Sequence, residues 1–438
     1  ADILAKGETM KIEKKLWITL FAFGMFAICF SGWIFSQSTV REKLFWDNTI
    51  RCETKELKEG EIKAENIALP EDFDVPKSIL FKTTHTIAEV WLDGEKIFGY
   101  GNEADAPGFM KTPGSCWHIV DIPGDSSGKN LEVRIIPVYE GYYGNEVSLV
   151  YGTRGDCILK ILTDCLGILV ISCGILFAAV ICILLYCGAA RRKRSDKTEA
   201  KIEIFLNLGF FSLLVAVWTL VQCGFLQFLI PDGRTLYFVE YFSLFLFPVP
   251  FNFLLYDICK SRYHKGALIF SILYLTNMAV DVLLQCTGII DMSRLLSVIH
   301  VIMVANVVYT VVIILYEAGK KENDVAQKFR YPMCVVMGFG MAEMIFYYLR
   351  RFEQISILLS MGTMLFIIML IWIQVSQYYD QYIQKQKVIY LQKIANMDML
   401  TEAMNRNAYE DMVKYLDEGE IKLSTTGVVV FDLDDLKV

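Results

Sequence analysis

Residues 158–187 read ILKILTDCLGILVISCGILFAAVICILLYC, and Lys160 and Asp164 are the only charged residues among them. A helix needs about 20 mostly apolar residues to cross the ~30 Å hydrocarbon core of a bilayer. This stretch is long enough, so it predicts a membrane-spanning helix. The cationic run Arg191–Arg194 follows it closely, which is typical of the cytoplasmic end of a span.

The same pattern recurs along the chain, which has 438 residues, is 54% hydrophobic and has a mean hydropathy of +0.40. Ordinary soluble domains are about 45–50% apolar, so the composition favours a multi-domain membrane protein. A net charge of −7 argues against a large basic surface, and no nucleic-acid partner is expected. We predict about eight spans, with an α-helical transmembrane bundle of about seven over 158–375. Besides 158–187, the predicted spans are 17–36, 202–230, 236–259, 266–288, 295–317, 331–349 and 355–375.

Lysine and arginine residues gather in alternate loops between the predicted spans. Cytoplasmic loops of membrane proteins carry an excess of these residues. We therefore expect segment 1–16 and the C-terminal end to be cytoplasmic, and residues 37–157 to lie outside a bacterial plasma membrane. The cations that decide this are Lys6, Lys11, Lys14, Lys15, Arg191–Arg194, Lys260, Arg262, Lys265, Lys320, Lys321, Lys328 and Arg330, with Arg350 and Arg351 as the exception.

The first apolar segment, 17–36, resembles a signal peptide because it follows the N-terminal lysines. It is longer than a typical signal-peptide core and shows no small-residue cleavage site, so we predict an uncleaved transmembrane anchor. A lipoprotein, with Ala27-Ile28-Cys29 as a poor lipobox, is the alternative. Met10 is a candidate natural start, and we expect the chain to be a piece of a longer protein.

Residues 37–157 are too polar to span a membrane and numerous enough for one domain. Short runs rich in β-branched and aromatic residues, such as 86–92, 96–100 and 131–136, predict antiparallel strands. Asp93-Gly94, between two of these runs, is a hairpin signal. The segment therefore predicts a β-sandwich or jelly roll that serves as an extracytoplasmic sensor domain.

The run AEVWLDGEKIFGYG at 88–101, followed by WHIVDIP at 117–123, resembles galactose-binding-like jelly-roll domains at the level of the fold. A carbohydrate is therefore one candidate ligand, beside peptides, lipids and wall fragments. Five aromatic residues are candidates for a sugar-stacking platform, or else for packing in the core or at a domain interface. Cys52 and Cys116 are candidates for a disulfide in an oxidising exterior. The aromatic candidates are Trp91, Tyr100, Trp117, Tyr142 and Tyr143.

Helix count and domain order resemble the bacterial seven-transmembrane receptors with diverse intracellular signalling modules. Ionisable residues inside spans are costly and often mark functional positions. Glu240, Asp281 and Glu343 are such residues, each either a polar relay that responds to ligand or a hydrogen-bonded structural residue. Pro248 and Pro250 are expected to kink their helix.

Beyond the last span, residues 376–396 are polar but keep a helical period. Apolar or long side chains recur at spacings of three and four, which is typical of a coiled coil. We predict a coiled-coil signalling linker, with an ordinary amphipathic exit helix as the alternative. The recurring residues are Val375, Tyr379, Tyr382, Gln386 and Ile389.

Residues 395–409 read ANMDMLTEAMNRNAY. They resemble DxLTGLxNRxxF, the opening motif of GGDEF domains, a family of diguanylate cyclases. Glu402 and Ala403 depart from the usual Gly-Leu. The matches are Asp398, Leu400, Thr401, Asn405 and Arg406, with Tyr409 in place of Phe.

These motif residues have expected structural roles. Thr401 is a candidate helix N-cap, since its hydroxyl can accept a hydrogen bond from a free backbone N–H. We also expect Asp398 to pair with Arg406.

Residues 427–431 predict a buried strand, and the acidic turn DLDDLK follows at 432–437. Together they resemble the first strand and metal loop of the same family, DxDxFK. By this resemblance Asp432 and the backbone carbonyl of Leu433 bind Mg²⁺, and Lys437 is a catalytic residue that stabilises the phosphates. Mg²⁺ prefers such oxygen ligands, and phosphoryl transfer needs charge stabilisation of this kind.

The resemblance implies a receptor that controls conversion of two GTP into cyclic di-GMP and two pyrophosphates. Each GGDEF domain holds one GTP substrate, so a homodimer is expected. The rest of the family's site would lie beyond Val438, so segment 397–438 is expected to be the inactive N-terminal part of an α/β GGDEF domain. The alternative is a non-catalytic membrane sensor whose degenerate GGDEF module binds a nucleotide or a partner. A transporter is a third class, which the fused sensor domain and coiled coil disfavour.

Overall fold

The computed structural model of the chain describes residues 49–51, 60–69, 76–102, 107–139, 148–193, 203–320, 323–349, 356–398, 401, 403–418, 427 and 429. They belong to two compact units, Ala1–Met369 and Leu370–Val438. The predicted anchor 17–36 lies outside the described residues.

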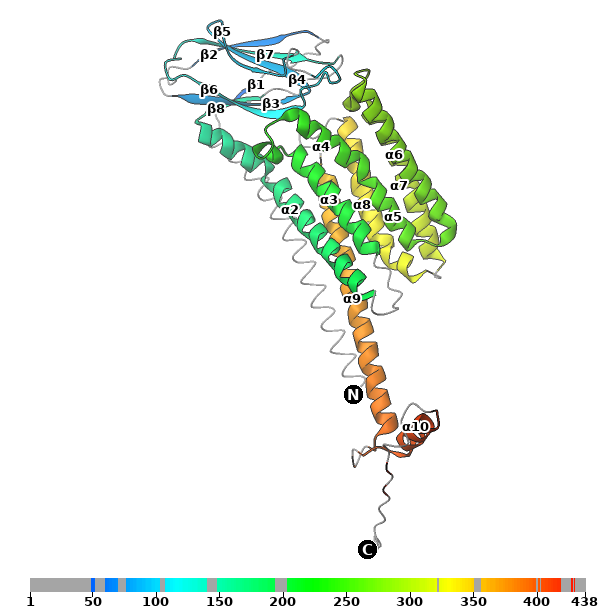
Figure 1. Ribbon diagram of the computed structural model, residues 1–438. Helices are drawn as coiled ribbons and strands as arrows, with labels where there is room; N and C mark the ends of the chain where they lie inside the picture. The colour runs from blue at the N-terminus through cyan, green and yellow to red at the C-terminus, as the bar shows by residue number, and fades with distance from the viewer. Residues whose placement is uncertain are drawn as a thin grey trace. The chain divides into compact units, whose positions relative to one another are not determined.

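The described strands of the first unit form two four-stranded antiparallel sheets, ordered β1-β8-β3-β6 and β2-β7-β4-β5. Figure 1 shows the two sheets as stacked layers. The strands are β1 (Thr49–Arg51), β2 (Lys63–Ala68), β3 (Lys77–Thr84), β4 (Thr86–Leu92), β5 (Glu95–Tyr100), β6 (Ser115–Ile122), β7 (Asn130–Pro137) and β8 (Ser148–Gly152).

Alternation of side chains along the strands builds the core between these sheets. In β4, Ala88, Val90 and Leu92 are buried in that core, and the residues between them face the other side of the sheet. The turn between β4 and β5 has positive φ at both Asp93 (47°) and Gly94 (82°), which is the geometry of a type I′ hairpin turn. The hairpin predicted from Asp93-Gly94 is therefore confirmed.

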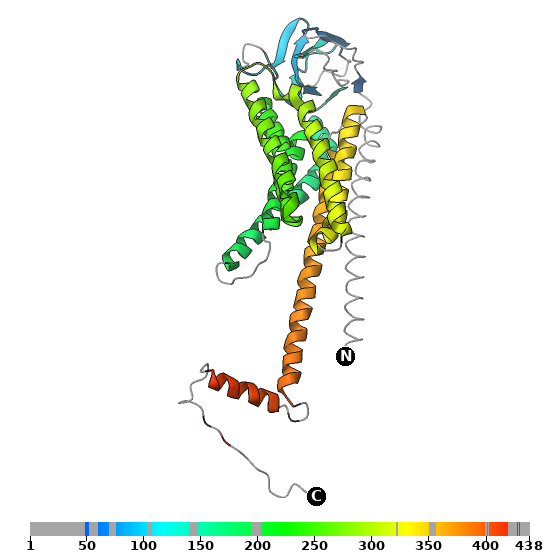
Figure 2. The ribbon, with the colours of Figure 1, turned by 90° about the vertical axis from the view of Figure 1, so that its right-hand side faces the viewer.

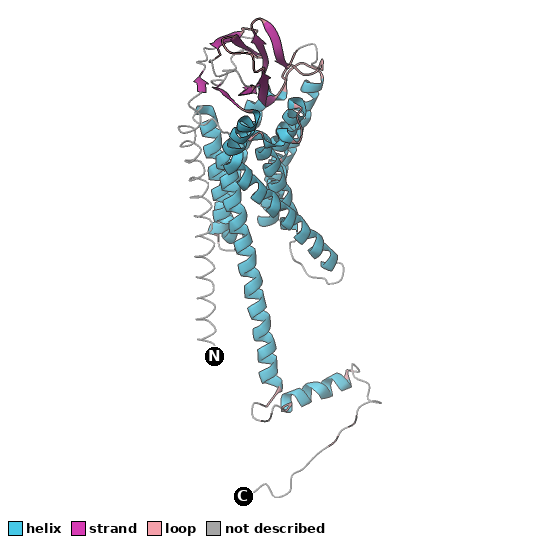
Figure 3. Cartoon of the chain, turned by 90° about the vertical axis from the view of Figure 1, so that its left-hand side faces the viewer, coloured by secondary structure: helices cyan, strands magenta, loops and turns pink. Residues whose placement is uncertain are grey.

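The outer face of the β1-β8-β3-β6 sheet packs on a helix. Phe81 of β3 points into the sandwich core, whereas its neighbour Leu80 packs with Ile161 and Cys165 of α2 (Arg154–Lys193). Residues 78–81 of β3 are all buried, so this part of the strand is covered on both faces and its sequence lacks a polar alternation. Figure 3 shows the strands gathered at one end of the helices of this unit.

Six helical segments in the described part of the chain are long and apolar enough to cross a membrane, so the chain is a multi-pass membrane protein. They correspond to the predicted spans between 158 and 349, and they run side by side in Figure 2. The predicted span 202–230 ends earlier than expected, at Gln222, where Gly224 with a φ of 79° follows. Large apolar side chains such as Phe177, Leu283 and Val301 are 69%, 63% and 70% exposed, as expected for helix faces that contact lipid. The helices are α2, α3 (Glu203–Gln222), α4 with α5 (Gly233–Leu246 and Pro248–Ile258), α6 (His264–Cys286), α7 (Leu296–Gly319) with the 3₁₀ turn η4 (Met292–Leu295) before it, and α8 (Asp324–Leu349).

The predicted span 236–259 is interrupted where the prolines stand. α4 ends at Leu246 and α5 begins at Pro248. Pro248 and Pro250 have no backbone N–H, so they cannot donate to the preceding turn. The predicted disturbance of this helix is confirmed.

Helix α9 (Ile357–Asn396) is a single helix of 40 residues, about 60 Å long at 1.5 Å per residue. Its apolar part is Ile357–Ile373, shorter than the six spans above. The predicted helix over 376–396 is therefore present, while its coiled-coil pairing with a second copy stays a prediction. α10 (Arg406–Asp417) follows in the second unit.

The strand predicted over 427–431 is wrong at the two positions that the structure describes there. Gly427 and Val429 lie outside any strand, and Val429 is 73% exposed. A buried strand needs a neighbouring strand to bond its backbone. The described residues of the second unit provide only an isolated bridge between Met397 and Met404.

Candidate functional site

A cavity of about 420 Å³ lies in the first unit, between the helices and the sheet that packs on them. Small-molecule sites in proteins are commonly ~300–1,000 Å³ in volume and mostly apolar, with a few converging polar groups. The wall includes residues of β3, β6 and all the helices from α2 to α9. The cavity is therefore contacted by both the sandwich and the bundle.

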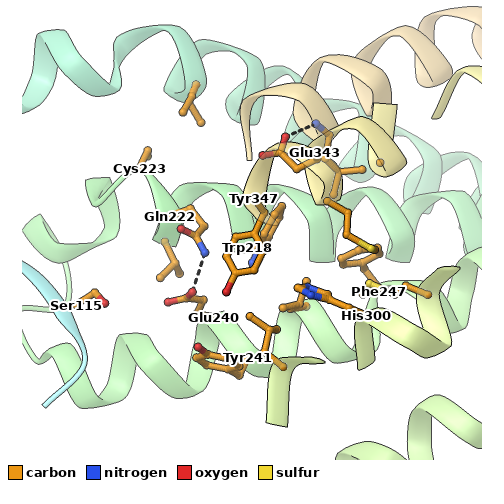
Figure 4. A pocket seen from close by; sticks show the side chains of 18 of the residues that line it. Ser115, Trp218, Gln222, Cys223, Glu240, Tyr241, Phe247, His300, Glu343 and Tyr347 are labelled. Carbon is orange, nitrogen blue, oxygen red and sulfur yellow. Dashed lines mark hydrogen bonds between the residues drawn. The ribbon is translucent and has the colours of Figure 1, made fainter. Parts of the chain in front are cut away.

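Glu240 brings a carboxylate to this cavity. It lies on α4 and accepts a hydrogen bond of 2.7 Å from the side-chain amide of Gln222, the last residue of α3. Figure 4 shows the two side chains joined across the space between these helices. The sequence prediction named Glu240, but not Gln222.

Aromatic and thioether side chains form much of the remaining wall. Trp218 of α3 packs against Phe247 with ring centroids 6.3 Å apart, and its buried indole N–H has no hydrogen-bond partner among the described residues. Buried donors usually have a partner, so an acceptor atom of a ligand would satisfy this one. Other members of the wall are Tyr241, Tyr274, Tyr347, Met303, Met337, Met341 and Met344.

Glu343 of α8 lines the cavity and also holds the beginning of α9. Its carboxylate accepts backbone hydrogen bonds from Ser356 (2.7 Å), Leu358 (2.8 Å) and Leu359 (3.0 Å). The first N–H groups of a helix lack partners within the helix, and a negative charge there is favoured by the helix dipole. Glu343 therefore has the structural role that was one of its two predicted interpretations, in a position that touches the cavity.

His300 of α7 supplies a further polar group. Its Nδ1 lies 2.9 Å from the hydroxyl of Tyr348, and its ring packs edge-on against Tyr347. Both aromatic residues belong to α8, the helix that also carries Glu343.

A buried polar network around Asp291 fixes the sandwich to the bundle. Asp291, in the loop after α6, accepts hydrogen bonds from the backbone N–H groups of Lys111 (3.3 Å) and Thr112 (3.2 Å) and from the hydroxyl of Tyr139. Its other oxygen accepts from the amide of Gln285 at 2.6 Å. Asp291 is only 5% exposed, so these bonds replace its lost hydration.

His85 connects this network to the cavity. It lines the cavity, and its Nδ1 lies 2.8 Å from the hydroxyl of Thr112. Burial lowers the pKa of His85 to about 4, although the charge of Asp291 opposes that shift. Burial and the hydrogen bond to Asp291 together raise the pKa of Tyr139. His85 is therefore neutral, and Tyr139 keeps its proton, near pH 7.

The described members of the predicted aromatic platform do not form one surface. Tyr100 donates to the carbonyl of Pro113 at 2.5 Å, and the backbone of Trp117 bonds the side-chain amide of Gln227 beside the helices. Trp91 is in the same sheet as Tyr100, but its ring lies under Arg134, whose Cζ is 4.5 Å from the ring centroid. Trp117 therefore packs against the helices, which was the alternative to a sugar-stacking role. Tyr142 and Tyr143 lie outside the described residues.

Cys116, one of the two candidates for a disulfide, is a free and buried thiol. Its sulfur lies 3.3 Å from the hydroxyl oxygen of Tyr100 and against Gly233 at the start of α4. Burial raises the pKa of this thiol. The side chain is thus used at the contact between sandwich and bundle. Cys52 lies outside the described residues.

Asp281 is the third predicted intramembrane acid, and it is not part of the cavity wall. It is 2% exposed and accepts a hydrogen bond of 2.6 Å from Asn277, one turn earlier on α6. This hydrogen bond within α6 agrees with the structural role, which was one of the two roles predicted for Asp281.

The opening motif of the predicted GGDEF domain forms a turn before α10. Asp398 accepts from the backbone N–H and the hydroxyl of Thr401, both at 2.9 Å. The predicted N-cap role of Thr401 is wrong, because Asn405 caps α10 by accepting from the N–H of Ala408. Arg406 donates to Glu410 at 3.0 Å, and its predicted pair with Asp398 stays a prediction.

The predicted metal ligands Asp432 and Leu433 and the predicted catalytic residue Lys437 lie outside the described residues. The residues that the structure does describe contain no group of three or more His, Cys, Asp or Glu side chains able to hold a metal. The Mg²⁺ site therefore stays a prediction from sequence.

Sequence reasoning missed Gln222, Asp291 and His300. A weak signal was present for two of them, since Gln222 and His300 are polar residues in or beside apolar segments. Asp291 carried no such signal, because it lies in a loop and its partner Tyr139 is 152 residues away.

Comparison of the chain with protein-family models, with curated proteins and with solved structures finds no match.

Proposed function

We propose that this chain is the sensing and transmitting part of a membrane receptor in which a ligand in the cavity alters the start of α9. The observation that carries this proposal is the double role of Glu343. It lines the cavity and accepts three backbone hydrogen bonds from residues 356–359. A ligand that moves or competes for this carboxylate would release or reorient the first turn of α9.

The sandwich supplies a second input under the same proposal. His85 and Trp117 contribute to the cavity wall from the sandwich, and the Asp291 network joins the two parts. A ligand bound to the sandwich would therefore act on the same cavity. The candidate ligands of this outer site are the carbohydrates, peptides, lipids and wall fragments named from the sequence.

The proposed location is a bacterial plasma membrane, with 37–157 outside and the C-terminal end in the cytoplasm. The alternate cationic ends and loops support it, for example Arg191 in the last turn of α2, Arg262 after α5 and Lys320 after α7. Cations of this kind are enriched on the cytoplasmic side.

The proposed output is a diguanylate cyclase in a longer protein that carries a whole GGDEF domain. Asp432 and Leu433 would bind Mg²⁺, and Lys437 would stabilise the phosphates of GTP. Each domain holds one GTP, so two copies must meet, and a homodimer through α9 would bring them together. Support comes from the two motifs at 398–406 and 432–437, in the family's order and spacing.

A second candidate function is a non-catalytic receptor with a degenerate GGDEF module. Glu402 and Ala403 favour it, because both depart from the family's Gly-Leu. Such a module would bind a nucleotide or a protein partner without forming cyclic di-GMP.

Cyclic di-GMP production by the longer protein separates these functions. The purified dimer in lipid nanodiscs, given GTP and Mg²⁺, should form cyclic di-GMP, and Asp432→Ala should reduce the rate at least ~100-fold, about 2.7 kcal/mol of transition-state stabilisation. Asp411→Ala, an exposed acid on α10, is the matched control and should keep the rate within about twofold. A folded wild type that binds GTP without turnover would favour the second function.

A further inference from the structure

The charged groups of the cavity wall are mostly acidic. Asp164, Glu240 and Glu343 line it, together with Lys82 as the one lysine or arginine in the described wall. Asp164 is paired with Lys160 at 2.9 Å, and Glu343 holds the start of α9. An anionic ligand would therefore meet repulsion, whereas a cation would meet attraction.

Glu240 is the carboxylate of this wall that can still accept further hydrogen bonds. Its partner is the neutral amide of Gln222, at 2.7 Å. An ionised carboxylate offers about four lone-pair sites, so most of its acceptor capacity is free for a donor. A buried carboxylate is stabilised when a cation that also donates hydrogen bonds approaches it.

Lys82 lines the same wall and its charge acts on Glu240, but among the described residues no hydrogen bond or ion pair joins the two side chains. Its side chain is exposed near the end of β3, an inner strand of its sheet, and its Nζ lies 5.6 Å from the centroid of the Trp117 ring. The cavity side of Glu240 is bordered instead by aromatic residues, since Trp218, Tyr241 and Tyr347 project toward the same space in Figure 4. Aromatic faces attract cations, and their hydrocarbon edges suit an apolar body.

We infer that the cavity binds an organic amine, whose protonated nitrogen pairs with Glu240 while its apolar body packs among the rings of Trp218, Tyr241 and Tyr347. A bare metal ion would leave these rings and most of the 420 Å³ unused. The inference deepens the proposed receptor function and rests on it, because it gives the ligand of that cavity a chemical class.

Three probes of matched shape and different charge test whether the cavity prefers an organic amine. The purified chain in nanodiscs is titrated at pH 7 by calorimetry with 2-phenylethylamine, 2-phenylethanol and 3-phenylpropionate. The amine should bind at least ~10-fold more tightly than the alcohol, and the acid should bind most weakly. Equal binding of amine and alcohol, a preference for the acid, or no binding of the amine would overturn the inference. This ranking uses the wild type alone, so it does not depend on whether a variant folds.

Substitutions then test whether Glu240 is the carboxylate that pairs with the protonated amine. Glu240→Gln should weaken the amine at least ~10-fold and leave the alcohol within about twofold. Asp281→Asn is the matched control, since Asp281 is a buried acid in a helix outside the cavity wall, and it should change neither affinity. Lys82→Met should keep or strengthen amine binding by removing a competing cation. Unchanged amine affinity in Glu240→Gln, or a loss in Asp281→Asn of equal size, contradicts the assignment.

Failure of this inference is distinct from failure of the proposed function. Binding of the alcohol without any gain for the amine would reject the ligand class and leave the receptor proposal standing. Binding of the amine through Glu240, without any change in cyclic di-GMP production or in the start of α9, would reject the receptor proposal and keep the ligand class.

Discussion

The carboxylate of Glu343 on α8 accepts a hydrogen bond of 2.7 Å from the backbone N–H of Ser356, 13 residues later in the chain. Ser356 has a φ of 96°, a left-handed conformation that costs a non-glycine residue of order 1 kcal/mol or more. Such a conformation persists where its surroundings hold it, and here Glu343 also binds the N–H groups of Leu358 and Leu359. The starting point of α9 is therefore set by a residue of the cavity wall.

Glu343→Gln should loosen the first turn of α9. The variant loses the charge at the helix N-terminus and one of the two acceptor oxygens, which is worth about 1–2 kcal/mol. Hydrogen exchange followed by mass spectrometry should show faster exchange at the amides of Ser356, Leu358 and Leu359. Exchange there at the wild-type rate would contradict the capping role.

Glu317→Gln is the matched control for that experiment. Glu317 of α7 is also a buried carboxylate that bonds backbone, at 3.2 Å from the N–H of Lys260, and it accepts from Asn323 at 2.7 Å. This variant should speed exchange at Lys260 and leave α9 unchanged. Equal acceleration of α9 by both variants would indicate general destabilisation of the bundle.

Asp291→Asn should weaken the attachment of the sandwich to the bundle by about 2–4 kcal/mol. The new amide N–H₂ would face donors, since Tyr139, Thr112 and Gln285 all donate to Asp291. Tyr139→Phe removes one donor and should cost about 1–2 kcal/mol. A thermal-unfolding double-mutant cycle checks the pair, and strictly additive effects of the two changes would exclude their direct coupling.

Gly233→Ala should destabilise the contact between α4 and the sandwich by more than about 2 kcal/mol. A Cβ at Gly233 would collide with the hydroxyl of Tyr100 and the sulfur of Cys116, and Pro113 carbonyl oxygen would lie 2.9 Å away. Gly167→Ala, in open space on α2, is the control and should be neutral or stabilising by up to about 1 kcal/mol. The melting temperatures of both variants in nanodiscs measure these effects. Similar values for the two variants would contradict the close contact of Gly233 with Tyr100 and Cys116.

Because His85 is buried in its neutral form, the folded chain should lose stability in mild acid. Its pKa is about 4 in the folded chain and 6.5 without burial, so the unfolded state binds more protons between these values. Stability from neutral His85 is fully present above pH 6.5 and falls as the pH drops toward 4, by about 3 kcal/mol in total. His85→Gln should flatten this part of the curve of melting temperature against pH. Parallel curves for the variant and the wild type would refute the burial of a neutral ring.

The sequence alone determined where the chain can cross a membrane. An apolar run of the required length is a local property, so 158–187 predicts α2, and Pro248 predicts the break between α4 and α5. The Asp93-Gly94 turn was also readable, because its positive φ angles are a local demand on two residues. The same local rules misplaced the cap of α10 at Thr401, where Asp398 captures that hydroxyl in a turn.

Only the tertiary structure decided which polar groups meet. Gln222 reaches Glu240 from another helix, and Tyr139 reaches Asp291 from the segment after β7, 152 residues away. Spacing within one segment cannot encode such pairs, because each depends on how helices and sheet pack. The burial of charge makes these pairs necessary, and the packed bundle determines their identity.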